Sequence, residues 1–186
     1  MTQGEKLLFL GDSLTAAGDW QSWFPDEEVT NLGVDGDTTA DVQARLDAVV
    51  DAAPDSIVLL IGTNDFGSKR SVEQVVRATE TILVDLRRRL PGARLLLQSV
   101  TPRTPEFSDR IQDANRHLRQ FAATVRAQYL DLWPALADGD HLRDDYTDDG
   151  LHLNAAGYDA WLDELRPALE RLRGEPPMSR PIRIIR

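Results

Sequence analysis

Short apolar runs alternate with longer amphipathic stretches along this chain of 186 residues. Each run ends at glycine, proline or a polar cluster, which is typical of strands buried inside a sheet. The clearest run extends from Ser56 to Ile61, is rich in β-branched residues and is closed by Gly62. We predict strands at residues 7–10, 29–32, 56–61, 93–99 and 129–132.

Between these runs, apolar residues recur every three or four positions, the period of an amphipathic helix. Ser71 followed by Gln74 has the pattern of a capping box, and Asn154 can cap the last helix. Pro167 is expected to kink or restart that last helix. The predicted helices cover residues 42–50, 71–90, 108–127 and 154–172, and residues 133–151 predict a long polar loop.

This alternation of strands and helices predicts an α/β fold, a three-layer sandwich with a five-stranded parallel sheet. Right-handed crossovers then place all strand carboxyl ends at one edge of the sheet. The length fits one domain, which we place at residues 1–173. Residues 174–186 form a tail rich in proline, arginine and isoleucine, and we hypothesise that it pairs with an acidic surface or with a second copy, giving a homo-oligomer.

Composition narrows the class of partner. The net charge is −10 and Lys6 and Lys69 are the only lysines, which disfavours nucleic acid and anionic membrane surfaces. No apolar run is long enough for a transmembrane helix, so we expect no integral membrane association. The chain lacks cysteine and its first residues do not resemble a secretory signal, so we expect a cytoplasmic protein.

Candidate chemistry begins at Ser13, which follows the first strand in Gly11-Asp12-Ser13. Ligands of open α/β sheets bind beyond the carboxyl ends of strands, so this hydroxyl is placed for nucleophilic attack. The tripeptide alone also fits a simple turn. The catalytic interpretation therefore needs a base, an orienting carboxylate and oxyanion donors.

His152 is the best candidate base, because His117 and His141 lie in solvated surroundings. Asp148 and Asp149 precede it by four and three residues. Either carboxylate can accept the Nδ1 proton, which leaves Nε2 to accept a proton from a hydroxyl.

Oxyanion donors are expected on the loops after the second and third strands. Gly36 can offer a backbone N–H and Asn64 a side-chain amide, while Gly33 is close enough in sequence to replace Gly36. A backbone N–H is free to face substrate where a glycine lets the chain turn.

Four ordered segments of the chain resemble the sequence blocks of the SGNH hydrolases, also called GDSL esterases. They are Gly11-Asp12-Ser13-Leu14, residues 31–38 (NLGVDGDT), Gly62-Thr63-Asn64-Asp65 and Asp149-Gly150-Leu151-His152. The resemblance implies the flavodoxin-like fold of that family and an esterase activity without a cofactor.

The resemblance also implies a role for each matching residue. Ser13 would be the nucleophile, His152 the base and Asp149 its orienting carboxylate. The amides of Ser13 and Gly36 and the side chain of Asn64 would form the oxyanion hole.

The substrate is less constrained by the sequence. The resemblance allows lysophospholipids, acyl thioesters, acetylated sugars and simple esters, and a chain without material for a lid favours small to medium acyl groups. Arg103 and Arg143 could meet an anionic leaving group. The residues that could line an acyl pocket are Trp20, Trp23, Phe66 and Phe107.

Two alternatives assign no esterase chemistry. The glycine-bearing loop 33–39 could bind phosphate or sugar in a non-enzymatic module, although its aspartates would repel phosphate. The acidic loop 138–149 lacks the spacing of a calcium loop, so we expect no metal.

Overall fold

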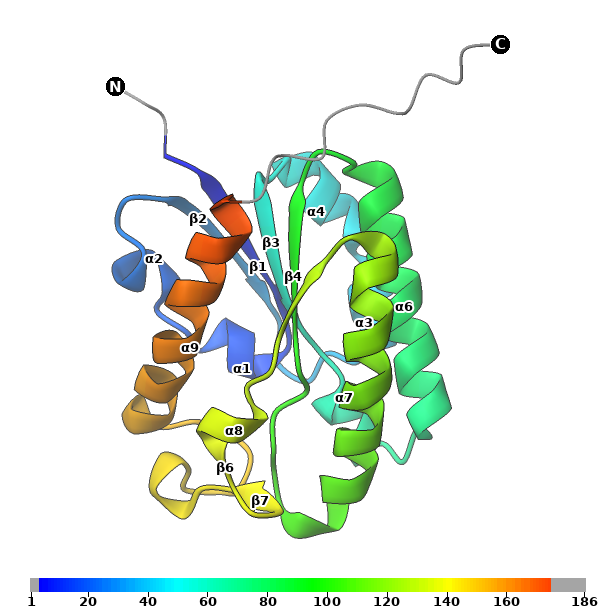
Figure 1. Cartoon of the computed structure of the whole chain (residues 1–186), viewed down its shortest axis with the longest axis vertical. Helices are drawn as coiled ribbons and strands as arrows, with labels where there is room; N and C mark the ends of the chain where they lie inside the picture. Colours follow the sequence, from blue (N-terminus) through cyan, green and yellow to red (C-terminus); the bar gives the residue numbers. More distant parts are fainter. Residues whose placement is uncertain (1–3, 175–186) are drawn as a thin grey trace.

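The computed structural model describes residues 4–174, which form an α/β three-layer sandwich (Figure 1). Its five-stranded sheet has the order β2-β1-β3-β4-β5, and every pair of neighbours is parallel. The predicted fold class is therefore confirmed. The strands are β1 Lys6–Gly11, β2 Glu28–Gly33, β3 Ser56–Leu60, β4 Arg94–Gln98 and β5 Gln128–Leu130.

Helices cover both faces of the sheet (Figure 1). One face carries α3 Thr39–Ala44, α4 Leu46–Ala52, α5 Thr63–Gly67, α6 Val72–Arg89 and α7 Ser108–Ala122. The other carries α1 Ser13–Ala16, α2 Trp20–Trp23, α8 Trp133–Leu136 and α9 Ala155–Gly174.

The alternation of side chains along β1 shows that the core has two layers. Leu8 and Leu10 of β1 pack in the layer under α3, α6 and α7, whereas Leu7 and Phe9 pack with Trp161 of α9. A strand buried on both faces reads as an uninterrupted apolar run, which explains why β1 and β3 were predictable from sequence.

Helix starts follow the predicted capping residues. The Ser71 hydroxyl accepts from the Gln74 amide and the Gln74 side chain accepts from the Ser71 amide, so both halves of the capping box are present. The Asn154 side chain accepts from the Gly157 amide at 3.1 Å.

Three predicted elements differ in the structure. The helix expected over residues 42–50 is two helices separated by Arg45, whose φ of −114° and ψ of 19° break the helical geometry. The third helix ends at Ala122 and continues as a 3₁₀ turn to Val125. The last helix runs through Pro167 without restarting, because core residues pack it on both sides of the proline.

The predicted long loop also contains structure of its own. After α8 come the paired strands β6 Ala137–Asp138 and β7 His141–Leu142, and then a 3₁₀ turn at Asp144–Tyr146. The hairpin is tied to the loop after β4 by a hydrogen bond from the Leu142 amide to the Arg103 carbonyl.

Most of the predicted tail, residues 175–186, lies outside the described residues. The hypothesis that the tail pairs with an acidic surface or with a second copy therefore stays a prediction. Within residues 4–174, none of the helices combines the length and the apolar character needed to cross a bilayer.

Candidate active site

Ser13 is the first residue of α1, directly beyond the carboxyl end of β1. Asp12 caps the helix by accepting from the Leu14 amide at 3.0 Å. With only four residues, α1 needs partners for its own carbonyls. Three side chains from other elements supply them.

The partners come from both ends of the chain. Trp20 Nε1 donates to the Thr15 carbonyl at 2.7 Å, and the Tyr158 hydroxyl donates to the Leu14 carbonyl at 2.7 Å. Asn31 Nδ2 donates to the Thr15 and Ala16 carbonyls at 3.2 Å each. These contacts fix the turn that presents the Ser13 hydroxyl.

The predicted serine, histidine and aspartate form a continuous hydrogen-bonded chain. Ser13 Oγ lies 3.2 Å from His152 Nε2, although 139 positions separate the two residues. His152 Nδ1 lies 2.7 Å from Asp149 Oδ2. This geometry allows Nε2 to accept the serine proton while the carboxylate stabilises the protonated ring.

Asp149, rather than Asp148, partners the imidazole. Within residues 4–174, Asp148 makes no hydrogen bond to His152, and its side chain is exposed. Asp149 Oδ1 also accepts the amides of Leu151 and His152, at 2.9 and 2.7 Å. The hydrogen bond from the imidazole, with those from the backbone, lowers the pKa of Asp149, so this carboxylate stays charged at any pH near neutral.

The turn that holds this pair depends on Thr147, a residue that the sequence analysis did not identify. Its hydroxyl donates to the His152 carbonyl at 2.7 Å and accepts the Gly150 amide at 3.0 Å. Gly150 has a φ of +77°, a backbone conformation that favours glycine. The threonine before an Asp-Gly turn was the available signal, because such hydroxyls commonly bind nearby backbone groups.

Gly36 is a better candidate oxyanion donor than Gly33. It occupies the third position of a turn closed by the Asp37 amide and the Val34 carbonyl, with a φ of +80°. Its N–H and that of Ser13 have no protein acceptor within residues 4–174. The Gly33 N–H, in contrast, donates to Asn31 Oδ1 at 2.9 Å.

Asn64, on α5, supplies the third candidate donor. Its Nδ2 donates one hydrogen to the Asp37 carbonyl at 2.9 Å, which leaves the second hydrogen of the amide for a ligand. The expected donors therefore lie in the three segments that follow β1, β2 and β3: Ser13 begins α1, Gly36 is in a turn and Asn64 is in α5.

Two aromatic residues predicted for the acyl pocket are core residues instead. Trp20 is 1% exposed and stacks on Phe9 with ring centroids 4.1 Å apart, and Phe66 is fully buried under α7. Helical spacing could not distinguish a pocket-facing aromatic from a core-facing one. Trp23 and Phe107 are only partly buried and stay candidates for substrate contact.

The two arginines proposed for the leaving group differ. The Arg103 guanidinium stacks over the Phe107 ring at 3.9 Å. It also donates to the carbonyl of Thr63 at 3.0 Å, the residue before Asn64. Arg143 is paired with Asp145 through two contacts of 3.1 Å, so its charge is already matched.

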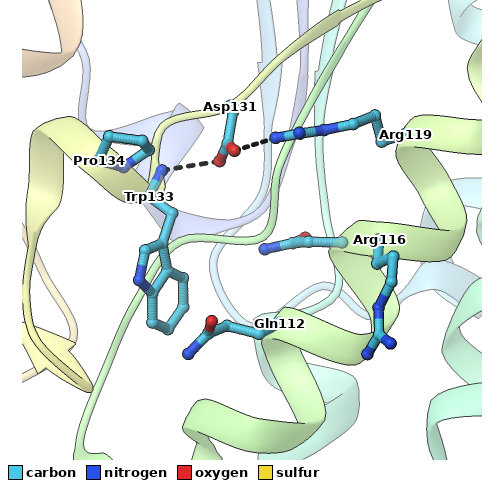
Figure 2. A pocket seen from close by; sticks show the side chains of 7 residues that line it. Gln112, Arg116, Arg119, Asp131, Trp133 and Pro134 are labelled. Atoms are coloured by element: carbon cyan, nitrogen blue, oxygen red, sulfur yellow. Dashed lines mark hydrogen bonds and ion pairs between the residues drawn. The ribbon is translucent and has the colours of Figure 1, made fainter.

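A separate cavity of about 230 Å³ lies between α7 and the segment after β5 (Figure 2). Figure 2 shows the Arg119–Asp131 ion pair at its rim and the Trp133 ring along one side. Two strands, β3 and β4, separate β5 from β1, and the lining contains no serine or histidine. The reactive groups are therefore concentrated at Ser13 rather than in this cavity.

Comparison with known families agrees with this geometry. The profile of the GDSL-like Lipase/Acylhydrolase family matches residues 9–160, a span that includes the whole hydrogen-bonded chain. The chain belongs to this family. The family assignment makes the protein an ester hydrolase of the SGNH type.

Individual relatives of the GDSL-like protein include mammalian enzymes. The platelet-activating factor acetylhydrolase IB subunit alpha1 of Bos taurus is 28% identical over 198 residues, covering 95% of this chain and 82% of the relative. The Homo sapiens protein of that name is 28% identical over 183 residues, covering 90% of this chain and 76% of the relative.

Solved structures share the fold. A GDSL-like lipase from Bacteroides thetaiotaomicron has a TM-score of 0.78 at 21% identity, covering 90% of this chain and 88% of the other. A catalytic mutant of an acetylxylan esterase from Geobacillus stearothermophilus has a TM-score of 0.72 at 20% identity, covering 97% and 99%.

Proposed function

We propose that the protein is a serine esterase that cleaves small to medium acyl esters through an acyl-Ser13 intermediate. The observation that carries the proposal is the chain of contacts from Ser13 Oγ to His152 Nε2 and from His152 Nδ1 to Asp149. A serine hydroxyl is a weak nucleophile unless a base of this kind removes its proton.

In the first half of the reaction, Ser13 Oγ attacks the ester carbonyl carbon and His152 Nε2 takes the hydroxyl proton. The carbonyl oxygen becomes an oxyanion, which the N–H groups of Ser13, Gly36 and Asn64 would stabilise. Collapse of this intermediate breaks the bond to the alcohol, and the protonated His152 gives the leaving alkoxide its proton.

In the second half, water replaces the alcohol. His152 removes a proton from the water, whose oxygen attacks the acyl carbon bound to Ser13. The second tetrahedral intermediate then releases the carboxylic acid, and Ser13 recovers its proton from His152. Each donor of an oxyanion hole contributes on the order of 10²–10³ in rate.

Acetyl esters are the substrate class that the comparisons support best. The named relatives include an acetylhydrolase and an acetylxylan esterase, both acting on acetyl groups by name. The proposal covers oxygen esters first and thioesters second.

The decisive experiment combines active-site labelling with turnover. A fluorophosphonate probe should label the wild-type protein, and Ser13→Ala should lose both labelling and hydrolysis of p-nitrophenyl acetate. Across a series of p-nitrophenyl esters, the rate should fall as the acyl chain lengthens. An unlabelled wild type would favour a non-enzymatic binding module, and a preference for long acyl chains would refute the small-acyl assignment.

Matched variants test the base and its carboxylate. Asp149→Asn should lower kcat by roughly 10²–10⁴, because it removes the charge that fixes the imidazole tautomer, whereas Asp148→Asn should leave kcat unchanged. Equal losses in the two variants would contradict the assigned roles.

A further inference from the structure

Arg45 connects two backbone segments of the candidate site. Its Nε donates to Asp37 Oδ2 at 2.7 Å, and its Nη2 donates to the Gly11 carbonyl at 3.0 Å. The side chains of Arg45 and Asp37 are 23% and 11% exposed, so solvent screens the pair only weakly. The arginine therefore holds the end of β1 at a fixed separation from the loop after β2.

Asp37 is in turn the common support of two oxyanion donors. Its amide closes the turn that contains Gly36, through a hydrogen bond to the Val34 carbonyl at 3.2 Å. Its carbonyl accepts from Asn64 Nδ2 at 2.9 Å, which orients that amide. A shift of Asp37 would consequently displace the Gly36 N–H and the Asn64 side chain together.

Gly11 relates the same network to the nucleophile. Its carbonyl accepts both from Arg45 and from the Val34 amide, the latter at 3.1 Å. A Cβ atom at Gly11 would lie 2.3 Å from the Leu60 carbonyl oxygen, so β1 is packed tightly here. Ser13 follows Gly11 by two residues. The position of the Gly11 carbonyl therefore also constrains the hydroxyl and the N–H of Ser13.

We propose that Arg45 is a positioning residue that holds the N–H groups of Ser13, Gly36 and Asn64 in one arrangement for the oxyanion. The inference rests on the proposed function, because without an acyl-transfer reaction there is no oxyanion to bind. The planar guanidinium suits the role, since two of its donors on one edge contact a carboxylate and a carbonyl at once.

The kinetic consequence follows from when the oxyanion forms. Donors that act on developing charge stabilise the transition state more than the bound ester, so their misplacement lowers kcat and leaves KM nearly unchanged. A displacement of about 1 Å can cost on the order of 10²-fold. Arg45→Met should therefore lower kcat about 10- to 100-fold.

The test uses Arg45→Met, Asp37→Ala and the double variant, with Arg89→Met as the matched control. Arg89 pairs with Asp47 of α4 on the surface, so the control removes an ion pair on the neighbouring helix. For each protein, kcat and KM are measured with p-nitrophenyl acetate, and kcat is divided by the fraction of protein that the fluorophosphonate probe labels at saturation. Thermal unfolding shows how far each variant is destabilised.

Four results are expected. Arg45→Met loses kcat per labelled site with KM within about twofold, at a temperature well below its Tm. The double variant loses no more than the worse single variant, because both residues act through one contact. Arg89→Met keeps the wild-type kcat. Binding of a trifluoromethyl ketone, which forms a tetrahedral oxyanion with the serine, weakens in Arg45→Met in parallel with kcat.

Other outcomes overturn the proposal in distinguishable ways. A wild-type kcat per labelled site in Arg45→Met refutes the inference alone, as does a loss that raises KM and leaves kcat intact. Additive losses in the double variant refute the route through Asp37. A wild-type protein without turnover refutes the proposed function and this inference together.

Discussion

The carboxyl group of Asp12 immediately precedes Ser13 and is completely buried. One oxygen accepts the Leu14 amide, while the other, Oδ2, is buried and unpaired within residues 4–174. Burial raises the pKa of Asp12 to about 7, against the opposing effect of that hydrogen bond. Asp12 therefore ionises near neutral pH rather than in the acidic range that is usual for an aspartate.

The raised pKa predicts how Asp12 affects stability. Between about pH 4 and pH 7 the unfolded chain has released the proton that the folded protein retains, so this residue lowers the free energy of unfolding as pH rises. The full effect is about 4 kcal/mol. Asp12→Asn should remove this dependence. The free energy of unfolding of the variant, relative to that of wild type, should therefore be higher above pH 7 than at pH 4.

Urea unfolding of wild type and Asp12→Asn at several pH values measures this difference. Asp148→Asn is the control, because that side chain is exposed and its removal should leave the pH dependence unchanged. Parallel stability curves for wild type and Asp12→Asn would show that the Asp12 carboxyl does not titrate near neutral pH.

Contacts between residues close in sequence were predictable from spacing, whereas a distant pair such as Ser13 and His152 was predictable only through the resemblance to a known family. The spacing of Asp149 and His152 predicts their contact because both lie on one turn. Arg45 reaches Gly11 across 34 positions, and its place in a helical stretch gives no sign of that contact. The choice between Gly33 and Gly36 also needed the structure, because it depends on the Asn31 side chain.

At the scale of elements, the short helix α1 depends on the packing around it. A helix of four residues is not stable by itself, so its position comes from the side chains that bind its carbonyls. Trp20 contributes one such contact and also fills the core between β1 and α9. Trp20 thus supports the turn that carries Ser13 and does not line an open pocket.

This role predicts a stability effect for Trp20. Trp20→Ala should lower the free energy of unfolding by about 3–5 kcal/mol, because it leaves a core cavity and removes the 2.7 Å hydrogen bond to the Thr15 carbonyl. The relative rates on short and long p-nitrophenyl esters should be unchanged. Trp23→Ala, at a partly buried position of the same helix, should cost clearly less.

Denaturant unfolding and the ester series check both statements. A changed acyl-chain preference in Trp20→Ala, with stability close to that of wild type, would show that Trp20 lines the acyl pocket instead.

The boundaries of helices were also hard to predict from the sequence. The apolar positions Val42, Leu46 and Val49 keep a helical period across the break at Arg45, so the pattern could not reveal two helices.

For the whole molecule, α9 completes the second core layer. Ala168, Leu169 and Leu172 near its end are at most 2% exposed, and Arg173 pairs with Glu5 and Glu27 at the start of β1 and β2. α9 extends to Gly174, the last residue that the structure describes, and the domain boundary at residue 173 stays a prediction.

Truncation tests this boundary. A chain ended after Gly174 should keep the Tm and the ester hydrolysis of the full chain, whereas one ended after Arg166 should fail to fold. The shorter chain loses two buried leucines, at about 2–5 kcal/mol each, which is comparable to the whole stability of a typical domain.

Light scattering of the same two folded proteins tests the hypothesis about the tail. If the chain ended at Gly174 has fewer subunits per particle than the full chain, the result would support association through residues 175–186. The same number of subunits in both proteins would refute it. A chain ended after Arg166 that still unfolds cooperatively would contradict the boundary.

The long separation between Ser13 and His152 has a consequence for synthesis of the protein. The hydroxyl leaves the ribosome early, but its imidazole partner follows only 139 residues later. Under the proposed mechanism, a nascent or prematurely terminated polypeptide carries an inert alcohol. Ester cleavage in the cell would therefore begin only after His152 has been synthesised and has folded against Ser13, and shorter translation products would leave acylated metabolites intact.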